Sequence, residues 1–303
     1  MKKLRTMLVA VLVLVAALLL PGVDVYASPV EGTVIALGED LDATQRATVL
    51  GLMGVTEEEL ANYKVITITN EQEHQYLDSY IDSSVIGTRA LSSVMVSPAE
   101  AGHGVVVTTQ NINYCTTGMY RNALLTAGVE DADILVVGPS SISGTSGLIG
   151  AIKAYEESSG ETVSEETLDT ALNEMVTTGA IVEKSANSEE VEALIAYIKA
   201  KLAAGELEDE DDIRKAIDEG EQKFGVSVTD DEAQQIVDFM MKIKKLGLDP
   251  NMLLDQAADL YDQFGDELLV KAQDENFLGG LGSVFDGAKK AIAGFFAKLF
   301  GSN

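Results

Sequence analysis

Residues 64–155 carry most of the β-strand patterns of this chain and limit the folds that it can adopt. Residues 64–69 alternate apolar and hydroxyl side chains, which is the period-two pattern of a strand. Residues 133–137 form a short apolar run, typical of a strand in the middle of a sheet. Upstream, residues 30–37 predict a first strand, so we expect one sheet in this half of the chain.

Two further strands are predicted over residues 91–96 and 104–109. Pro98 and Gly102 lie between them and favour a reversal of the chain. We therefore expect these two strands to pair as a hairpin.

Helix-capping residues separate the strands. Asn70, with Glu73 three residues later, predicts a capping box at the start of one helix. Thr116 or Thr117 can cap a second helix. The mixture of a hairpin with strand–helix units predicts an α+β fold over residues 28–160, with a mixed sheet and helices packed on a face.

Composition changes after Tyr155, where strand patterns stop and helical periodicity begins. Ser188 and Thr229 fit the N-cap position, and Glu232 is the capping-box partner of Thr229. The periodicity predicts helices over residues 165–183, 189–204, 209–223, 230–245 and 250–264. We therefore expect residues 161–278 to form an acidic all-α domain, or an arm packed against the first domain.

Residues 1–27 have the pattern of a secretory signal peptide. A basic start precedes the apolar residues 7–20, and Ala27 fits the cleavage rule for removal before Ser28. An uncleaved anchor is the alternative, but the apolar run is shorter than the roughly 20 residues that span a bilayer. We expect an exported protein that resides in the cell envelope or outside the cell.

Acidic side chains outnumber basic ones by 49 to 21, which gives a formal net charge of −28. Such a charge repels nucleic acid, and no nucleic-acid partner is expected. The densest acidic run, residues 208–212, lacks the spacing, the glycine and the closing glutamate of a calcium loop. We expect it to form the solvated first turn of a helix.

Cys115 is the only cysteine, so no internal disulfide can form. Its position between a strand and a helix cap favours burial as a small apolar side chain over a reactive thiol. His74 and His103 are the only histidines, and no metal-binding motif surrounds either of them. We therefore expect neither a metal ion nor a cofactor.

Two polar segments, residues 108–118 and 138–147, follow predicted strands and open helices. If those strands are parallel, both segments lie at one edge of the sheet and form a cleft lined by hydroxyl groups. The ligand-binding candidates are these hydroxyls and the nearby cationic side chains: Ser141, Ser143, Thr145, Ser146, Thr116, Thr117, Arg89, His103 and Arg121. The alternative is that the hydroxyls only cap two helices.

A hydrolase is a second hypothesis, with a hydroxyl of residues 141–146 as nucleophile and His103 as base. It requires His103 to lie within hydrogen-bond reach of that hydroxyl. The P-loop, dinucleotide-binding and Gly-x-Ser-x-Gly patterns are all absent. We therefore expect a non-enzymatic binding or structural module, whose ligand or envelope partner the sequence does not identify.

The last part of the chain has a different pattern. Residues 279–282 are three glycines and a leucine, which suit a flexible joint, and residues 283–303 predict an amphipathic helix. Its apolar side carries Phe285, Ile292, Phe295, Phe296 and Leu299, and lysines mark the other side. Such a helix can make peripheral contact with a membrane or dock on its own protein.

Three segments are distinctive: TRALSSVMVSPAEAGHGVVVTT, YCTTGMYRNALLTAGVEDADILVVGP and SGTSGLIGAIKAYE. With the export pattern ahead of them, they resemble the YpuA-like family of exported bacterial proteins of unknown function (DUF1002). The resemblance extends over residues 30–183 and weakens through the acidic helices. It implies an extracellular or cell-wall location in a Gram-positive bacterium, and it implies no activity and no functional residue.

Overall fold

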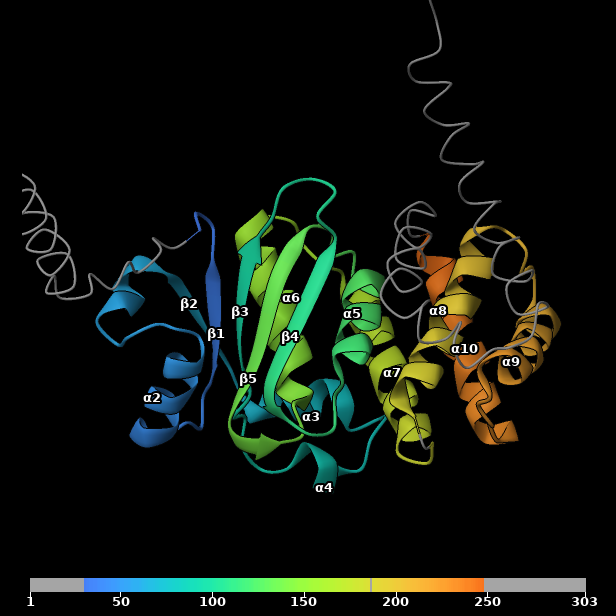
Figure 1. The fold of residues 1–303 in the computed structure, drawn as a ribbon, viewed down its shortest axis with the longest axis horizontal. Coiled ribbons are helices and arrows are strands. Elements are labelled where there is room, and N and C mark those ends of the chain that lie inside the picture. The colour runs from blue at the N-terminus through green and yellow to red at the C-terminus, as the bar shows by residue number, and fades with distance from the viewer. Residues whose placement is uncertain (1–29, 186, 248–303) are drawn as a thin grey trace, which may run out of the picture. The chain divides into compact units, whose positions relative to one another are not determined.

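A five-stranded mixed sheet forms the first half of the protein (Figure 1). The computed structural model describes residues 30–185 and 187–247. The strands are β1 (Val34–Gly38), β2 (Lys64–Ile68), β3 (Ser93–Pro98), β4 (Val105–Ile112) and β5 (Ala132–Ile142). In the order β2-β1-β3-β5-β4, β2 is parallel to β1 and β4 to β5, while β3 is antiparallel to both of its neighbours. The predicted α+β fold is therefore confirmed.

Strands β3 and β4 run in opposite directions but do not pair with each other. Strand β5 lies between them, antiparallel to β3 and parallel to β4, so the predicted hairpin is wrong. The chain does turn after Pro98, and Gly102 has the positive φ of a turn residue. The apolar character of β5 decides the pairing. Ile134 and Val136 face one core and Val137 faces another, and a strand buried on both faces belongs in the middle of a sheet.

Helix α6 (Thr145–Ser159) covers one face of the sheet and lies behind β3 and β5 in Figure 1. Two glycines let its backbone approach the strands closely. A Cβ atom at Gly147 would lie 2.7 Å from Val136 Cγ1, and one at Gly150 would lie 3.3 Å from Val94 Cγ2. Because a larger side chain does not fit at Gly147, the first turn of α6 is held against β5.

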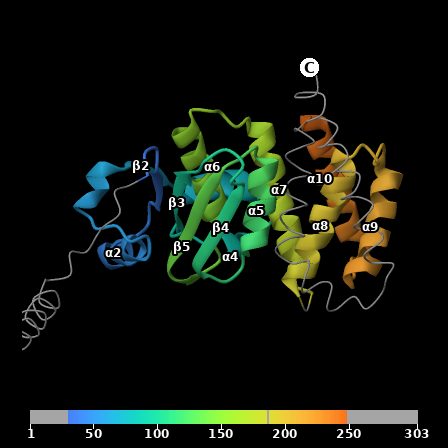
Figure 2. The ribbon, with the colours of Figure 1, turned by 45° about the horizontal axis from the view of Figure 1, so that its top comes forward.

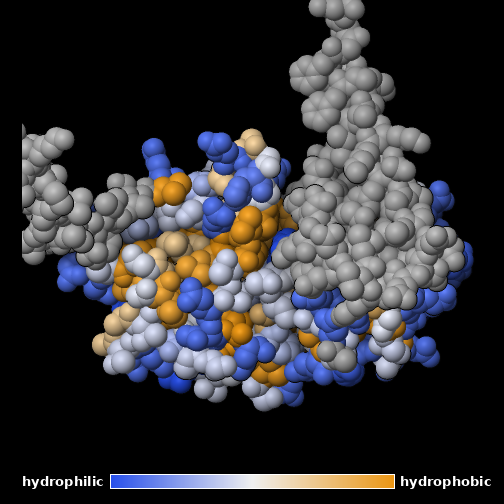
Figure 3. Space-filling view, in the orientation of Figure 1, coloured by the Kyte–Doolittle hydropathy of each residue, from blue (hydrophilic) through white to orange (hydrophobic). Residues whose placement is uncertain are grey.

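The opposite face of the sheet is less completely covered. Helix α2 (Ala43–Leu52) and the short 3-10 helix η1 (Glu59–Asn62) pack against part of it. Over β4 this face is open, and Val106 is 45 % exposed. Figure 3 shows apolar side chains gathered over this part of the sheet.

Two of the predicted N-caps occur where the sequence indicates. Thr229 and Glu232 form the capping box of α10 (Asp230–Leu246), and Thr116 caps α5 (Thr117–Thr126). At α8 (Ser188–Ala203) the cap is Asn187, one residue before the predicted Ser188.

Helix α3 (Asn70–Leu77) begins after Thr69. The Gln72 N–H donates to Thr69 Oγ1 at 3.1 Å, and the Thr69 N–H donates to Gln72 Oε1 at 2.9 Å. The predicted capping box of Asn70 and Glu73 is therefore wrong by one residue. A β-branched hydroxyl just before the helix takes the cap, and the Glu73 side chain is left for tertiary contacts.

Four longer helices follow the sheet region: α7 (Glu165–Val182), α8, α9 (Glu210–Phe224) and α10. Their bounds differ from the predicted ranges by no more than about one residue, within the usual scatter of helix ends. Helix α7 packs against α5 and adds Leu168, Leu172 and Met175 to the core beside the sheet. Helices α8, α9 and α10 enclose a second core (Figure 2).

A fully buried ion pair joins α5, α7 and α8. Lys199 Nζ donates to Glu174 Oε1 at 3.0 Å, to the Asn122 carbonyl oxygen at 2.8 Å and to Thr126 Oγ1 at 2.8 Å. Both charged side chains are 0 % exposed. The three N–H groups of the ammonium thus have three acceptors, so this cluster is structural and has no donor left for a ligand.

Other single-residue predictions also have an outcome. Cys115 is buried, as expected, and burial raises the pKa of its thiol to about 12. The acidic residues 208–212 are mostly exposed at the start of α9, where Asp212 N donates to Asp209 Oδ1 at 3.0 Å, so the solvated helix turn is confirmed. Within residues 30–185 and 187–247, no helix has the length and apolar character needed to cross a bilayer.

Three predictions fall on parts of the chain outside the described residues. They are the signal peptide at residues 1–27, the helix at 250–264 and the terminal segment at 279–303.

Candidate functional site

Strands β4 and β5 are parallel, so both end at the same edge of the sheet. Their pairing continues past the strands. Asn113 N donates to the Ile142 carbonyl oxygen at 2.9 Å, and Cys115 N donates to the Ser143 carbonyl oxygen at 3.0 Å. The two polar segments therefore lie side by side, as the sequence predicted for parallel strands.

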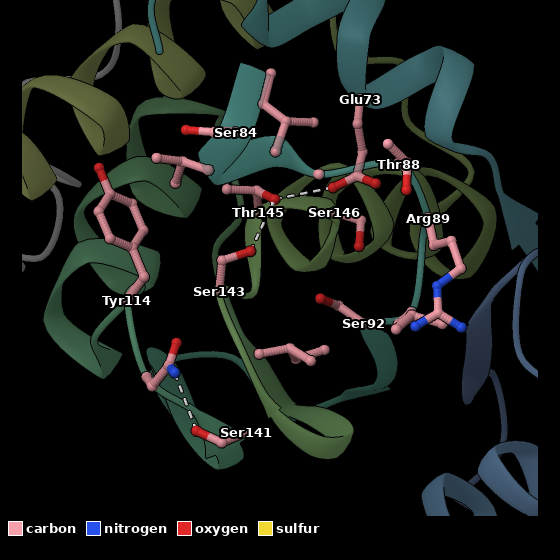
Figure 4. Close-up of a pocket in the computed structure, with 16 residues that line it drawn as sticks. Glu73, Ser84, Thr88, Arg89, Ser92, Tyr114, Ser141, Ser143, Thr145 and Ser146 are labelled. Carbon is pink, nitrogen blue, oxygen red and sulfur yellow. Dashed lines mark hydrogen bonds between the residues drawn. The ribbon is translucent and has the colours of Figure 1, made fainter. Parts of the chain in front are cut away.

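A cavity of about 500 Å³ lies at this edge (Figure 4). Helix α3 contributes one wall, and helix α4 (Ser83–Ile86) with the segment that leads to β3 contributes another. The two polar segments complete it. Most of its polar side chains carry hydroxyl groups. Among the described residues that line it, Glu73 is the only acid and Arg89 the only base.

The cavity brings together part of the predicted set of ligand-binding residues. Ser141, Ser143, Thr145, Ser146 and Arg89 line it. The other predicted residues, Thr116, Thr117, His103 and Arg121, do not.

Thr116 and Arg121 belong to a buried contact between α5 and α8. The Thr116 hydroxyl caps α5 and also donates to the carboxyl group of Glu192. Arg121 is 7 % exposed, and its charge acts on the same carboxyl group. Burial nevertheless raises the pKa of Glu192 to about 7. Thr117 is the first residue of α5, so the helix-capping alternative holds at this segment.

His103 lies at the opposite end of the sheet from the cavity. Its Nε2 is 3.0 Å from Asp133 Oδ1 at the start of β5, whereas Ser141 is near the end of that strand. The paired length of β4 between these ends is roughly 20 Å, at about 3.3 Å per residue. His103 is therefore out of reach as a base for residues 141–146, and this part of the hydrolase hypothesis is wrong.

Glu73 is a site residue that the sequence analysis missed. It is 1 % exposed. Its Oε1 accepts a hydrogen bond from Thr145 Oγ1 at 2.9 Å, its Oε2 accepts one from Asn70 Nδ2 at 3.2 Å, and the Ser146 hydroxyl also bonds to it. Burial raises the pKa of Glu73, and these hydrogen bonds offset that effect only in part. The competing cap at Thr69 was the available signal, because it leaves the Glu73 side chain outside the capping box.

Several polar side chains of the cavity have no hydrogen-bond partner within the described chain, and two of them stand out. Ser92 is 4 % exposed, and its hydroxyl has no hydrogen-bond partner there. Figure 4 shows this hydroxyl pointing into the cavity. The guanidinium of Arg89 likewise has neither a hydrogen bond nor an ion pair with a described residue. The Ser92 hydroxyl is therefore open to the cavity, where a ligand can supply its hydrogen-bond partner.

Gly144 shapes the turn that starts α6. Its φ of +94° suits glycine, and a Cβ atom there would lie 2.6 Å from Tyr120 Oη. The buried Tyr120 hydroxyl donates to the Gly144 carbonyl oxygen and so stabilises this turn. This geometry sets Thr145 and Ser146 against Glu73.

The arrangement suits binding better than bond cleavage. The Thr145 hydroxyl donates to Glu73 Oε1 at 2.9 Å and lies 3.4 Å from Ser143 Oγ, so it is held within the side-chain hydrogen bonds that line the cavity. Ser141 Oγ accepts a hydrogen bond from Asn113 Nδ2 at 3.0 Å and has no base beside it among the described residues. In the same part of the chain, no cluster of three or more His, Cys, Asp or Glu side chains is arranged to hold a metal ion.

Comparison with known proteins identifies a family. The model of the family described as "Protein of unknown function (DUF1002)" matches residues 37–260. The "Uncharacterized protein YpuA" of Bacillus subtilis (strain 168) is 36 % identical over 297 residues, which cover 98 % of this chain and 100 % of that protein. No solved structure matches the chain. The resemblance predicted from the sequence is thus confirmed, and the chain belongs to the DUF1002 family of proteins of unknown function.

Proposed function

We propose that this chain is an exported binding protein that holds a small polar ligand in the cavity at the ends of β4 and β5. The observation that carries the proposal is the pair of unsatisfied groups there, the Ser92 hydroxyl and the Arg89 guanidinium. The cavity volume of about 500 Å³ falls within the usual range of small-molecule sites. Strand and helix ends supply part of its lining, and a preformed site reduces the entropy cost of binding.

The chemistry of the cavity supports a binding role over a catalytic one. No histidine is among the described residues that line it, so its hydroxyls have no imidazole base there. His103 pairs with Asp133 at the far end of the sheet. The one carboxyl group, that of Glu73, is already engaged by neutral donors. A set of hydroxyl groups around one cation favours recognition of a polar ligand by hydrogen bonds.

The binding proposal predicts an affinity that depends on Arg89. We expect at least one class of compound to raise the midpoint of thermal unfolding of the full chain when four classes are tested: neutral sugars, organic anions, organic amines and zwitterionic amino acids or peptides. A ligand at a hundred times its Kd stabilises a protein by about 2.7 kcal/mol, which thermal unfolding detects readily. Arg89→Gln should weaken binding at least about tenfold, because charge-assisted hydrogen bonds are lost.

Arg46→Gln is the matched control for this experiment. Arg46 carries the same charge on α2, which packs against the other face of the sheet, and it pairs with Glu57 there. Its replacement should leave the affinity unchanged. If none of the four classes stabilises the chain, or if the ligand found binds Arg89→Gln and Ser92→Ala as tightly as the original protein, the cavity is not the binding site.

The location outside the cytoplasm is part of the same proposal, and so is peripheral membrane contact by residues 283–303. Both rest on sequence patterns: the cleavage motif ending at Ala27, and the apolar side that includes Phe295 and Phe296. In a Gram-positive host, we expect N-terminal sequencing to find a chain that starts at Ser28 and sediments with the membranes. Deletion of residues 283–303 should release that processed chain into the medium. An unprocessed chain in the cytoplasm would refute export, and unchanged sedimentation of the deletion variant would refute the membrane contact.

A further inference from the structure

The cavity contains one group of each charge, and the two do not neutralise each other. Glu73 and Arg89 both line it, yet no ion pair joins them or links either one to another side chain in the part of the chain that the structure describes. In Figure 4 Glu73 lies at the top of the cavity and Arg89 at its right side, with Thr88 labelled between them. A ligand in this space therefore meets a carboxyl group and a guanidinium at the same time.

Glu73 lacks a cationic partner. Its hydrogen bonds come from a side-chain amide and two hydroxyls, those of Asn70, Thr145 and Ser146. The ionisable side chain whose charge acts on it is His74, whose imidazole is already held by Asp78 and the Gly87 carbonyl oxygen. Removing a carboxylate from water is costly unless a positive group accompanies it. Burial raises the pKa of Glu73, because the charged carboxylate loses water contacts and no ion pair replaces them.

Arg89 lacks an anionic partner. Its side chain is exposed at the cavity, where a guanidinium can bind a carboxylate with two parallel hydrogen bonds. Ser92, three residues later, adds a buried hydroxyl that points into the same space and can donate to that carboxylate. This wall of the cavity therefore matches an anionic group and the Glu73 wall matches a cationic one.

We infer that the ligand is a zwitterion, an amino acid or short peptide whose free carboxylate binds Arg89 and Ser92 while its free ammonium group binds Glu73. This inference rests on the proposed function. A simple anion would satisfy Arg89 but face the carboxyl group of Glu73, and a simple amine would meet the reverse conflict. A neutral sugar would leave both charges without a partner.

The test uses chemically matched probes and the full chain. Alanine, alanyl-alanine and trialanine are titrated by calorimetry, and the tightest binder is compared with its N-acetyl derivative and its carboxamide. Each derivative removes one charge and keeps the remaining structure. We expect one or more zwitterions to bind, and each derivative to bind at least about tenfold more weakly, a difference of about 1.4 kcal/mol.

Variants assign each charge to its partner. Glu73→Gln should abolish the preference for the free amine over the N-acetyl derivative, and Arg89→Gln should abolish the preference for the free carboxylate over the carboxamide. The control variants are Glu71→Gln, at an exposed position on the same helix α3, and Arg46→Gln. Both should keep both preferences. The comparison of probes on the unaltered protein remains decisive if Glu73→Gln fails to fold.

The outcomes separate this inference from the broader proposal. If the N-acetyl derivative binds as tightly as the zwitterion, the ligand is a simple anion. If an amine, an anion or a sugar binds and no zwitterion does, the inference is likewise wrong, and in both cases the binding site stands. If no compound of any class binds, both are overturned.

Discussion

Replacement of Lys199 by methionine is expected to lower the free energy of unfolding by about 3–5 kcal/mol. The substitution removes the ammonium group but leaves the Glu174 carboxyl group fully buried, with both residues at 0 % exposure in the original protein. It also leaves the Asn122 carbonyl oxygen without this donor. An uncompensated buried charge is among the most destabilising changes that a single substitution can make. Urea unfolding at pH 7, monitored by circular dichroism, measures the effect.

A double variant tests whether the charge itself is responsible. Glu174→Leu combined with Lys199→Met replaces the ion pair by apolar side chains, and such replacements are often neutral or stabilising. We expect the double variant to be more stable than Lys199→Met alone, with a coupling energy on the order of 2–3 kcal/mol in a double-mutant cycle. Additive effects of the two substitutions would show that the pair contributes through packing alone.

The second large effect is a dependence of stability on pH at Glu192. Burial raises the pKa of its carboxyl group from 4.5 to about 7 in the folded protein, and the Thr116 hydroxyl and Arg121 charge offset only part of that effect. The folded protein therefore binds a proton that the unfolded chain releases between pH 4.5 and about 7. The resulting stabilisation is fully present below pH 4.5 and is lost as the pH rises through about 7.

Glu192→Gln isolates this titration, because glutamine stays neutral at every pH. Relative to the original protein, the variant should gain about 2–3 kcal/mol of stability between pH 5 and pH 8. Urea unfolding of both proteins at several pH values gives the difference directly. A difference that does not change with pH would mean that Glu192 is already charged and compensated in the folded state.

Glu57→Gln provides a control of opposite sign. The hydrogen bond from Arg46 lowers the pKa of Glu57, so the stabilisation from Glu57 is present at neutral pH and is lost as the pH falls. The Glu57→Gln variant should therefore become relatively less stable as the pH rises toward 4.5, and its relative stability should stay constant between pH 5 and pH 8. A slope for Glu192→Gln but not for Glu57→Gln between pH 5 and pH 8 would exclude a general effect of removing a negative charge from an acidic chain.

The candidate site was only partly predictable from the sequence. The two polar segments, and their place at one edge if β4 and β5 were parallel, follow from the local pattern of apolar runs and hydroxyl-rich turns. The parallel pairing and the contribution of α3 do not, because they join residues far apart in the chain. Thr145 bonds to Glu73 across 72 positions. The position of His103 at the other end of the sheet likewise follows from strand direction and not from residue type.

The sequence by itself determined the longer helices, two of the four N-caps, the approximate strand positions, the burial of Cys115 and the family. These features depend on hydrogen bonds and apolar periodicity within a few residues, so a short segment contains the information. Only the tertiary structure decided that β5 separates β3 from β4, that Glu73 is buried in the cavity and that Lys199 meets Glu174 inside the helices. In each case the deciding free energy comes from burying groups that meet only when distant segments pack together. The local preferences of a short segment do not include that contribution.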